Sequence, residues 1–416
     1  MSSQGWVGLQ SMSSIHISAW RRCLRTLVRL FLGLSIALAS NFSFLAAAQT
    51  APTATELRGV WLTNVDSDVL FSRSNLDRAI QRLQRLNLNT IYPTVWHEGS
   101  TLYPSAVTKR AFGETISPAP GLQGRDMLAE AIEMGHAHNL AVIPWFEFGL
   151  MSEERSELML KHPEWVTTRK DGTSVFIYGD RKQHHFVWLN PLRPEVQDFL
   201  VKLFLEVVSK YNIDGIQIDD HFGMPVELGY DDYTVARYQK EHNGKRPPDD
   251  PKDPEWVRWR SHFVTNLMLR IFSAVKTTKP NCVISLSPNP KDFSYENYAQ
   301  EWYRWVQLGF INELIVQVYR DDLDDFLLEL NRPELREVRQ KIPVGIGILT
   351  GLRVQNVDMK QIERQVKATR DGEFNGFSFF FYETLGNRDA AFKSLLATPA
   401  TRPDKLIPVS DDNALN

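Results

Sequence analysis

The chain has 416 residues, of which 43% are hydrophobic and 23% are charged, and its formal net charge is −3. This balance is typical of a globular protein and excludes a disordered or fibrous chain. A mildly acidic protein lacks the basic surface that nucleic-acid binding requires, so we expect no nucleic-acid partner.

Residues 1–48 have the composition of a secretory signal peptide. Arginines between positions 21 and 29 precede an apolar stretch over 30–45, and Ala46–Ala48 offers a small-residue cleavage site. The alternative is an uncleaved membrane anchor, because the apolar stretch approaches spanning length. Cleavage would remove four arginines and no acid, which changes the charge from −3 to −7, and would leave Cys282 as the only cysteine. We therefore expect an exported protein, periplasmic or extracellular or associated with the envelope surface, without an internal disulfide.

From Leu57 onward, short apolar runs alternate with amphipathic helical patterns. Strands are predicted over 57–65, 89–96, 141–148, 215–220, 283–288, 313–319, 344–349 and 376–382. Apolar spacing of 3.6 residues predicts helices near 74–86, 126–138, 194–211, 255–278, 296–308, 322–340, 358–371 and 387–397. Eight strand–helix units predict an α/β fold, a (β/α)8 TIM barrel over residues 55–398. A doubly wound open sheet is the alternative, although no glycine-rich phosphate loop follows the first strand.

Two long connections interrupt this repeat. Residues 149–193, after the third strand, are too long for an ordinary loop and predict a substrate lid or a small hairpin subdomain. Residues 223–254, after the fourth strand, form a second insertion that is polar and rich in proline. Residues 399–416 are predicted to be a polar C-terminal tail.

The fourth predicted strand ends in the run Gly215–Phe222, in which apolar residues lead into two adjacent carboxylates. Catalytic groups of such barrels lie at the carboxyl ends of the strands. Strand alternation predicts that Gln217 and Asp219 point into the barrel and that Asp220 turns outward at the rim. We interpret Asp219 as a catalytic nucleophile or base and Asp220 as its helper, with a structural role as the alternative for each.

Two more acids, Glu147 and Glu383, follow aromatic runs at the ends of the third and eighth strands. Glycoside hydrolysis requires a protonated acid at the leaving oxygen and an ionised carboxylate as nucleophile or base. Because apolar surroundings raise the pKa of a carboxyl group, either glutamate could be the acid that works with Asp219.

Other side chains at the strand ends are predicted to bind substrate, since aromatic rings can stack on sugars and polar groups can bind hydroxyls. The predicted set is Trp61, Trp96, His97, Trp145, Gln217, His221, Asn289, Gln317, Tyr319 and Tyr382. Packing is the alternative role for the aromatic members and for His97. We expect no metal or other cofactor, because no acids lie at ligand spacing near His184 and His185.

Several motifs, in this order, resemble the glycosyl hydrolase-like family ten, also called the domain of unknown function 187, over roughly residues 55–385. They are Glu56–Thr63, His162–Trp165, Trp188–Pro191, Tyr211–Asp220 and Trp259–Arg260. The resemblance implies a relation to alpha-amylase-type barrels, whose fourth strand supplies an aspartate nucleophile two residues after an inward polar side chain. Gln217 and Asp219 match that spacing, with glutamine where the amylases have arginine.

The resemblance also implies a link to bacterial cell-wall glycan. The chain departs from the family pattern at two positions: His221 stands where tyrosine is expected, and Glu147 stands where many members have asparagine. These departures affect the identity of the acid and of the substrate.

The sequence therefore predicts an exported glycoside hydrolase that acts on a polysaccharide, with peptidoglycan glycan strands favoured. A glycan-binding barrel without catalysis, acting as an envelope scaffold, is the alternative of a different class. A metal-dependent hydrolase is disfavoured because no His-x-His motif ends the first strand. The sequence sets no oligomeric state.

Overall fold

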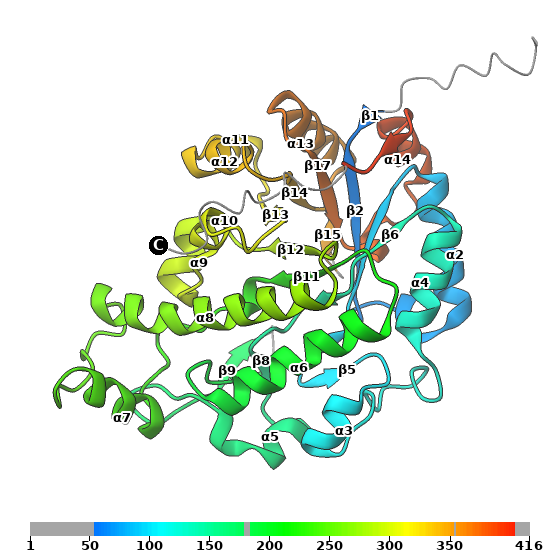
Figure 1. Ribbon diagram of the computed structural model, residues 1–416. Helices are drawn as coiled ribbons and strands as arrows, with labels where there is room; N and C mark the ends of the chain where they lie inside the picture. The colour runs from blue at the N-terminus through cyan, green and yellow to red at the C-terminus, as the bar shows by residue number, and fades with distance from the viewer. Residues whose placement is uncertain (1–53, 179–183, 353–354, 404–416) are drawn as a thin grey trace, which may run out of the picture. The chain divides into compact units, whose positions relative to one another are not determined.

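The computed structural model describes residues 54–178, 184–352 and 355–403, and the predicted signal peptide lies outside them. Parallel strands form a central sheet that is surrounded by helices (Figure 1). In sheet order the strands are β6 (Ala141–Val142), β3 (Thr90–Pro93), β2 (Leu57–Leu62), β17 (Gly376–Phe380), β14 (Val344–Leu349), β13 (Glu313–Gln317), β12 (Val283–Ser287), β11 (Gly215–Asp219) and β7 (Trp145–Phe146).

The two outermost segments of this sheet are halves of the same strand, since only Ile143 and Pro144 separate β6 from β7. β6 pairs with β3 and β7 pairs with β11. Proline has no N–H to donate, which interrupts the ladder here, but the Pro144 carbonyl still accepts from the Gln217 amide at 2.8 Å. The sheet therefore closes on itself, which confirms the predicted (β/α)8 barrel over the open sheet.

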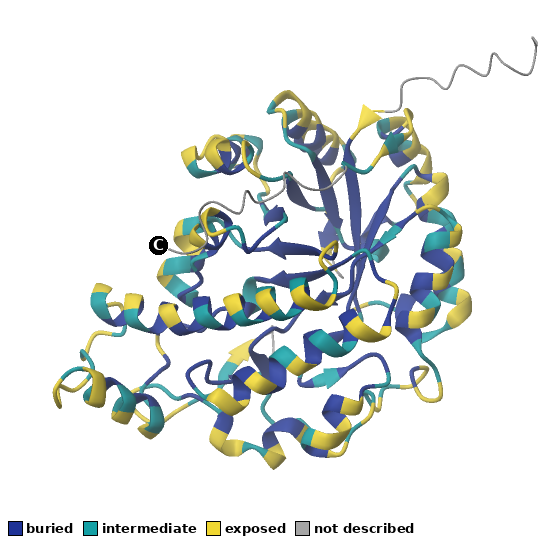
Figure 2. Cartoon of the chain, viewed as in Figure 1, coloured by how far each residue is buried: buried dark blue, intermediate teal, exposed yellow. Residues whose placement is uncertain are grey.

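Amphipathic helices cover the barrel, and each buries one face and exposes the other (Figure 2). They are α2 (Arg73–Arg85), α4 (Met127–Ala137), α6 (Pro194–Lys210), α8 (Pro254–Thr278), α9 (Lys291–Tyr298), α10 (Trp302–Gln307), α11 (Leu323–Leu330), α12 (Pro333–Val338), α13 (Met359–Asp371) and α14 (Asp389–Leu395). Helix α2 illustrates the pattern, with Leu76, Ile80 and Leu83 all buried at helical spacing. None of the described helices is both long and apolar enough to cross a membrane.

Two of the helix predictions were wrong in detail. The helix predicted over 322–340 is divided into α11 and α12, because Pro333 cannot continue a helix and instead begins the second one. The helix predicted over 296–308 begins only at Trp302, since Ala299 has a left-handed φ of 50° that ends α9. The residues between α9 and α10 become important for the site below.

The insertion after the third strand contains a small antiparallel sheet of β8 (Met151–Glu153), β10 (His184–Trp188) and β9 (Phe176–Tyr178). It also contains α5 (Glu157–Lys161) and a 3-10 turn, Pro163–Trp165. The insertion after the fourth strand contains α7 (Asp232–Glu241).

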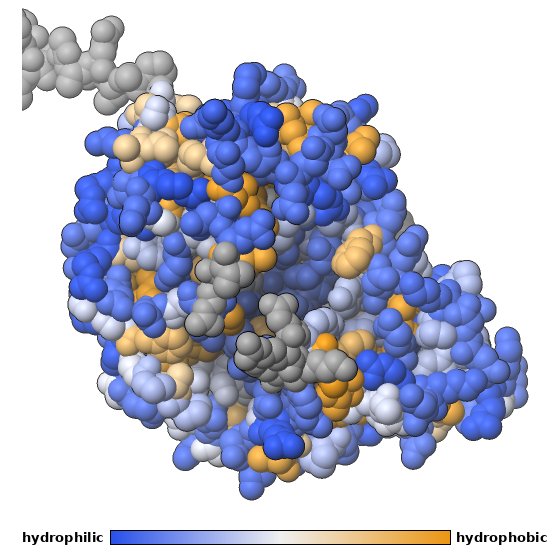
Figure 3. All heavy atoms as spheres, turned by 180° about the vertical axis from the view of Figure 1, so that it is seen from behind, coloured by the Kyte–Doolittle hydropathy of each residue, from blue (hydrophilic) through white to orange (hydrophobic). Residues whose placement is uncertain are grey.

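Other short elements were not predicted. They are β4 (Trp96–His97), β5 (Ser100–Thr101), α3 (Ala106–Phe112), β15 (Gly351–Leu352) and β16 (Gln355–Asn356). The surface on the side of the molecule opposite to Figure 1 is mostly hydrophilic and is hollowed near its centre (Figure 3).

Residues near the end of the described chain pack against the amino-terminal end of the barrel. β18 (Ala400–Thr401) pairs with β1 (Ala54–Thr55), and Arg402 forms an ion pair with buried Glu313. The structured barrel thus extends beyond residue 398, into the segment predicted as a polar tail.

Candidate active site

The fourth strand, β11, ends at Asp219, and the 3-10 turn η3 (Asp220–Phe222) follows directly. The Asp219 Oδ1 atom accepts a hydrogen bond from the backbone N–H of His221 at 2.8 Å. A short side chain that binds the backbone two residues ahead favours such a turn. The side chain of Asp219 is only 2% exposed, whereas that of Asp220 is 19% exposed.

Asp220 leans over the ends of the two neighbouring strands. Its Oδ2 atom accepts from Asn289 Nδ2 at 2.7 Å, and its Oδ1 atom accepts from Gln317 Nε2 at 3.0 Å. Asn289 follows β12 and Gln317 ends β13. The prediction that Asp220 turns outward was therefore wrong, because the chain enters η3 at this residue and strand alternation no longer applies.

His221 lies against both aspartates. Its Nδ1 atom is 3.2 Å from Asp219 Oδ1, 3.8 Å from Asp220 Oδ1 and 3.1 Å from the backbone oxygen of Glu147. Burial favours the neutral imidazole, but the charges of Asp220 and Asp219 prevail and raise the pKa of His221 to about 10. At neutral pH His221 is thus an internal cation beside the carboxylates.

Glu147 follows β7 and is 8% exposed. Its Oε2 atom accepts a hydrogen bond from Thr94 Oγ1 at 3.1 Å. Burial and the charge of Asp219 raise the pKa of Glu147 to about 8, and burial and the charge of Asp220 raise the pKa of Asp219 to about 7. At neutral pH Glu147 therefore holds a proton that it can donate.

A glycine allows the loop after Glu147 to approach η3 closely. Gly149 has φ 47°, and a Cβ atom added there would lie 2.7 Å from the backbone nitrogen of Phe222. The backbone N–H of Leu150 donates to the His221 oxygen at 3.0 Å. The ends of the third and fourth strands are thus held together at the acids.

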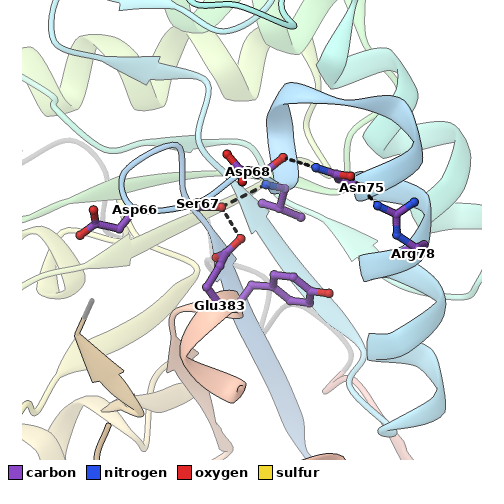
Figure 4. Close-up of a pocket in the computed structure, with 8 residues that line it drawn as sticks. Asp66, Ser67, Asp68, Asn75, Arg78 and Glu383 are labelled. Carbon is purple, nitrogen blue, oxygen red and sulfur yellow. Dashed lines mark hydrogen bonds between the residues drawn. The ribbon is translucent and has the colours of Figure 1, made fainter. Parts of the chain in front are cut away.

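Glu383 lines a pocket of about 630 Å³ between the ends of the first and eighth strands, and Glu147, Asp219 and Asp220 are not among the residues that line it (Figure 4). Ser67 Oγ donates to a carboxylate oxygen of Glu383. Burial raises the pKa of Glu383, and the charge of Asp68 adds to this effect, whereas neither Glu147 nor Asp219 is among its main causes in the described part of the chain. The structure thus does not bring Glu383 to the other acids. Tyr382 lines the same pocket as Glu383, and the Arg82 guanidinium lies 5.3 Å from the centre of its ring.

Three predicted stacking platforms are buried inside the protein. Trp61, Trp96 and Trp145 are at most 3% exposed. Trp61 Nε1 donates to Gln217 Oε1 at 2.7 Å, and Gln217 Nε2 donates to Ser285 Oγ at 3.0 Å, inside the barrel. Because these rings and the Gln217 amide have no open face, the structure places them in the packing of the barrel and not on a sugar-binding surface.

Tyr319 and His97 lie nearer to the acids. Tyr319 is half-buried, and burial together with the charges of Asp220, Asp219 and Glu147 raises the pKa of its hydroxyl well above the usual range. His97 is 4% exposed and accepts from Asn64 Nδ2 at 3.2 Å. Burial lowers the pKa of His97 to about 3, so its imidazole is neutral.

The structure also places three residues at the site that the sequence analysis missed. Gln300 Nε2 donates to the backbone oxygen of Asp219 at 3.0 Å. Tyr178, from β9, and Tyr298, from α9, lie near Asp220, since burial raises the pKa of both hydroxyls and the charge of Asp220 adds to the rise. None of the three ends a barrel strand, so a search restricted to strand ends could not find them.

One group of described residues has metal-ligand geometry. The ligand atoms of Asp219, Asp220 and His221 lie within 4.8 Å of one another. However, His221 Nδ1 lies 3.1 Å from the backbone oxygen of Glu147, which can only accept a hydrogen bond, so this nitrogen carries a proton and does not offer a lone pair to a metal. We therefore assign no metal to this group.

The chain is similar in sequence to two bacterial proteins described as glycosyl hydrolases. It is 26% identical over 335 residues to YngK of Bacillus subtilis (strain 168), covering 71% of this chain and 60% of that protein. It is 25% identical over 323 residues to DigH of Escherichia coli (strain K12), covering 65% of this chain and 67% of that protein. The chain therefore spans less than two thirds of the length of the Bacillus relative.

Solved structures with a similar fold are also glycoside hydrolases. The PgaB (BpsB) glycoside hydrolase domain from Bordetella bronchiseptica has a TM-score of 0.59 at 12% identity and covers 84% of this chain and 99% of that domain. Alpha-L-fucosidase isoenzyme 2 from Paenibacillus thiaminolyticus has a TM-score of 0.57 at 15% identity, covering 83% of this chain and 48% of the fucosidase. At these identities the likeness shows the fold alone.

The family comparison covers most of the barrel. Residues 56–368 match the model of the family described as "Glycosyl hydrolase-like 10", which is the family that the sequence motifs resemble. This match supports the predicted enzyme class, a glycoside hydrolase, and the chain belongs to the glycosyl hydrolase-like 10 family.

Proposed function

We propose that this protein is an exported glycoside hydrolase that cleaves O-glycosidic bonds of a cell-envelope or extracellular polysaccharide, with peptidoglycan glycan strands favoured. One observation carries the proposal: buried Glu147 and the pair Asp219–Asp220 meet at adjacent strand ends. No arginine or lysine of the described residues forms an ion pair with any of the three.

This arrangement separates the two roles that glycoside hydrolysis requires. Glu147, with its pKa raised to about 8, keeps a proton for the leaving oxygen at neutral pH. The aspartate pair supplies an ionised carboxylate, which attacks the anomeric carbon or takes a proton from the attacking water. Protonated His221 beside the pair offsets the repulsion between its two negative charges.

The proposed location and substrate have separate support. The composition of residues 1–48 supports export. The motif resemblance to a family linked with bacterial cell-wall glycan supports an envelope polysaccharide, and the hydrophilic, hollowed face in Figure 3 suits a polar ligand.

The test is the release of reducing ends from intact peptidoglycan, peptide-stripped peptidoglycan and an extracellular polysaccharide. We expect the wild type to release them from peptide-stripped glycan and a Glu147→Gln variant to release them at least about 100-fold more slowly. If the wild type binds the glycan but releases no reducing ends, the protein is a glycan-binding barrel and the proposal is wrong.

A further inference from the structure

Resting on the proposed function, we infer that Asp220, and not Asp219, is the ionised carboxylate that acts at the anomeric carbon, and that Asn289, Gln317 and Gln300 position it. The sequence pattern had assigned this role to Asp219. Four sets of contacts support the new assignment.

Both carboxylate oxygens of Asp220 are held in place. Asn289 donates to one at 2.7 Å and Gln317 donates to the other at 3.0 Å. Hydrogen bonds to both oxygens fix the direction in which the carboxylate points. The Asp220 side chain also remains 19% exposed, so a substrate can reach it.

One carboxylate oxygen of Asp219 is engaged by the protein itself. Its Oδ1 atom accepts from the backbone N–H of His221 at 2.8 Å and lies 3.2 Å from the imidazole of that residue. Its side chain is 2% exposed. These contacts fit a residue that shapes the turn and holds the imidazolium, rather than one that contacts the substrate.

Gln300 forms hydrogen bonds to the backbone of both aspartates. Its Nε2 atom donates to the carbonyl oxygen of Asp219 at 3.0 Å and to that of Asp220 at 3.4 Å. Gln300 is 1% exposed, and its own backbone N–H donates to the Ser294 oxygen at 3.2 Å. The break between α9 and α10 thus presents a fixed amide to the turn.

Asn289 is held in place by residues of α9 and α10. Its backbone oxygen accepts from Trp302 Nε1 at 3.0 Å and from Ser294 Oγ at 2.9 Å. Gln317 is fixed by a second hydrogen bond, to the Ser287 oxygen at 2.9 Å. The Gln317 amide and the backbone of Asn289 are therefore held in place before substrate binds, as positioning residues require.

Cleavage of the glycosidic bond requires Glu147, Asp220 and one water molecule. Glu147 gives its proton to the leaving oxygen as the bond from that oxygen to the anomeric carbon breaks, and the bonding electrons leave with the oxygen. Asp220 either takes a proton from the water that attacks the anomeric carbon, or forms a bond to that carbon itself. In the second case water, which gives its proton to Glu147, then replaces Asp220 at the carbon.

Matched variants separate the two aspartates. Asp220→Asn should lower kcat by roughly 10³-fold or more on peptide-stripped peptidoglycan, whereas Asp219→Asn should lower it by only about 10-fold to 100-fold. Sodium azide should restore turnover to Asp220→Ala and not to Asp219→Ala. Circular dichroism verifies that each variant is folded.

The kinetic constants of variants at the positioning residues give a second test. If Gln317 orients Asp220, Gln317→Ala should lower kcat by about 10-fold or more and change KM less than about threefold, and Asn289→Ala and Gln300→Ala should behave alike. Exposed Gln307 on α10 provides the matched control, and Gln307→Ala should leave both constants unchanged. A raised KM with an unchanged kcat in Gln317→Ala would mean that this residue binds substrate instead.

The outcomes distinguish the inference from the function on which it rests. An active wild type with an equally active Asp220→Asn variant, or azide rescue confined to Asp219→Ala, overturns the inference and leaves the proposed function standing. A wild type that releases no reducing ends overturns the proposed function, and the inference with it.

Discussion

The two ends of the barrel differ in whether their buried acids are paired with arginine. At the amino-terminal end, Glu56 lies 2.6 Å from Arg58 Nε and 2.7 Å from Arg370 Nε, and Glu313 forms an ion pair with Arg402. At the carboxyl end, the only cationic side chain beside Glu147 and Asp219 in the described part of the chain is His221.

The difference is visible in the pKa values. Burial alone would raise the pKa of Glu56, but hydrogen bonds and charges from Arg370 and Arg58 lower it. Glu147 has no such partner, and burial raises its pKa to about 8. Acids paired with arginine hold the scaffold together, whereas buried acids without such a partner keep a proton available for chemistry.

The largest predicted effect compares these two glutamates directly. Glu147→Gln should lower kcat by about 10²-fold to 10⁴-fold and leave the protein folded, because it removes only the proton donor. Glu56→Gln should lower the free energy of unfolding and leave kcat of the folded protein unchanged. Reducing-end release and urea unfolding of both variants check this, and a full kcat in Glu147→Gln would contradict it.

The ion pair at the amino-terminal end should matter for stability. Arg402→Ala leaves the carboxylate of Glu313 buried without its cation, and should lower the free energy of unfolding by about 3–5 kcal/mol. The exposed pair of Arg73 and Glu133 is the control, since Arg73→Ala should leave the free energy of unfolding nearly unchanged. Equal losses in the two variants, measured by urea unfolding, would show that burial of the pair is unimportant.

Removing the carboxyl group of Glu147 should change how stability depends on pH. The folded pKa of about 8 lies above the ordinary value of 4.5, so the folded state binds more protons between these values and wild-type stability falls as pH rises. Glu147→Gln lacks this loss, and should gain about 3 kcal/mol relative to the wild type between about pH 5 and about pH 8. Urea unfolding at the two pH values measures the gain. An identical pH dependence in both proteins would contradict the raised pKa.

The smallest predicted effect concerns Glu383, whose pocket lies apart from the other acids. Glu383→Gln should change kcat and KM by less than about threefold, because its carboxyl group contacts Ser67 and not Glu147 or Asp219. A loss of kcat as large as that of Glu147→Gln would instead make Glu383 the acid.

Much of the fold could be predicted from the sequence because strands and helices alternate with clear periodicity. The division of the third strand at Pro144 was not predicted, since only the pairing with β3 and β11 reveals it. The split at Pro333 was readable in principle, because proline cannot continue a helix.

The site was less predictable than the fold. Strand ends correctly indicated where polar groups gather, but they do not tell whether an aromatic ring such as Trp61 fills the barrel or faces the substrate. The direction of Asp220 depends on the turn η3, and the contact of Gln300 with β11 joins residues 81 positions apart in the chain. These features depend on tertiary neighbours, which a periodic pattern does not encode.

The pH dependence of kcat/KM on peptide-stripped peptidoglycan tests most directly whether a buried acid without a basic side-chain partner does the chemistry. Activity should fall above a pH of about 8, as Glu147 loses its proton, and the low residual activity of Glu147→Gln should show no such fall. A wild-type profile that stays flat through this range, or a fall that persists unchanged in Glu147→Gln, would contradict it.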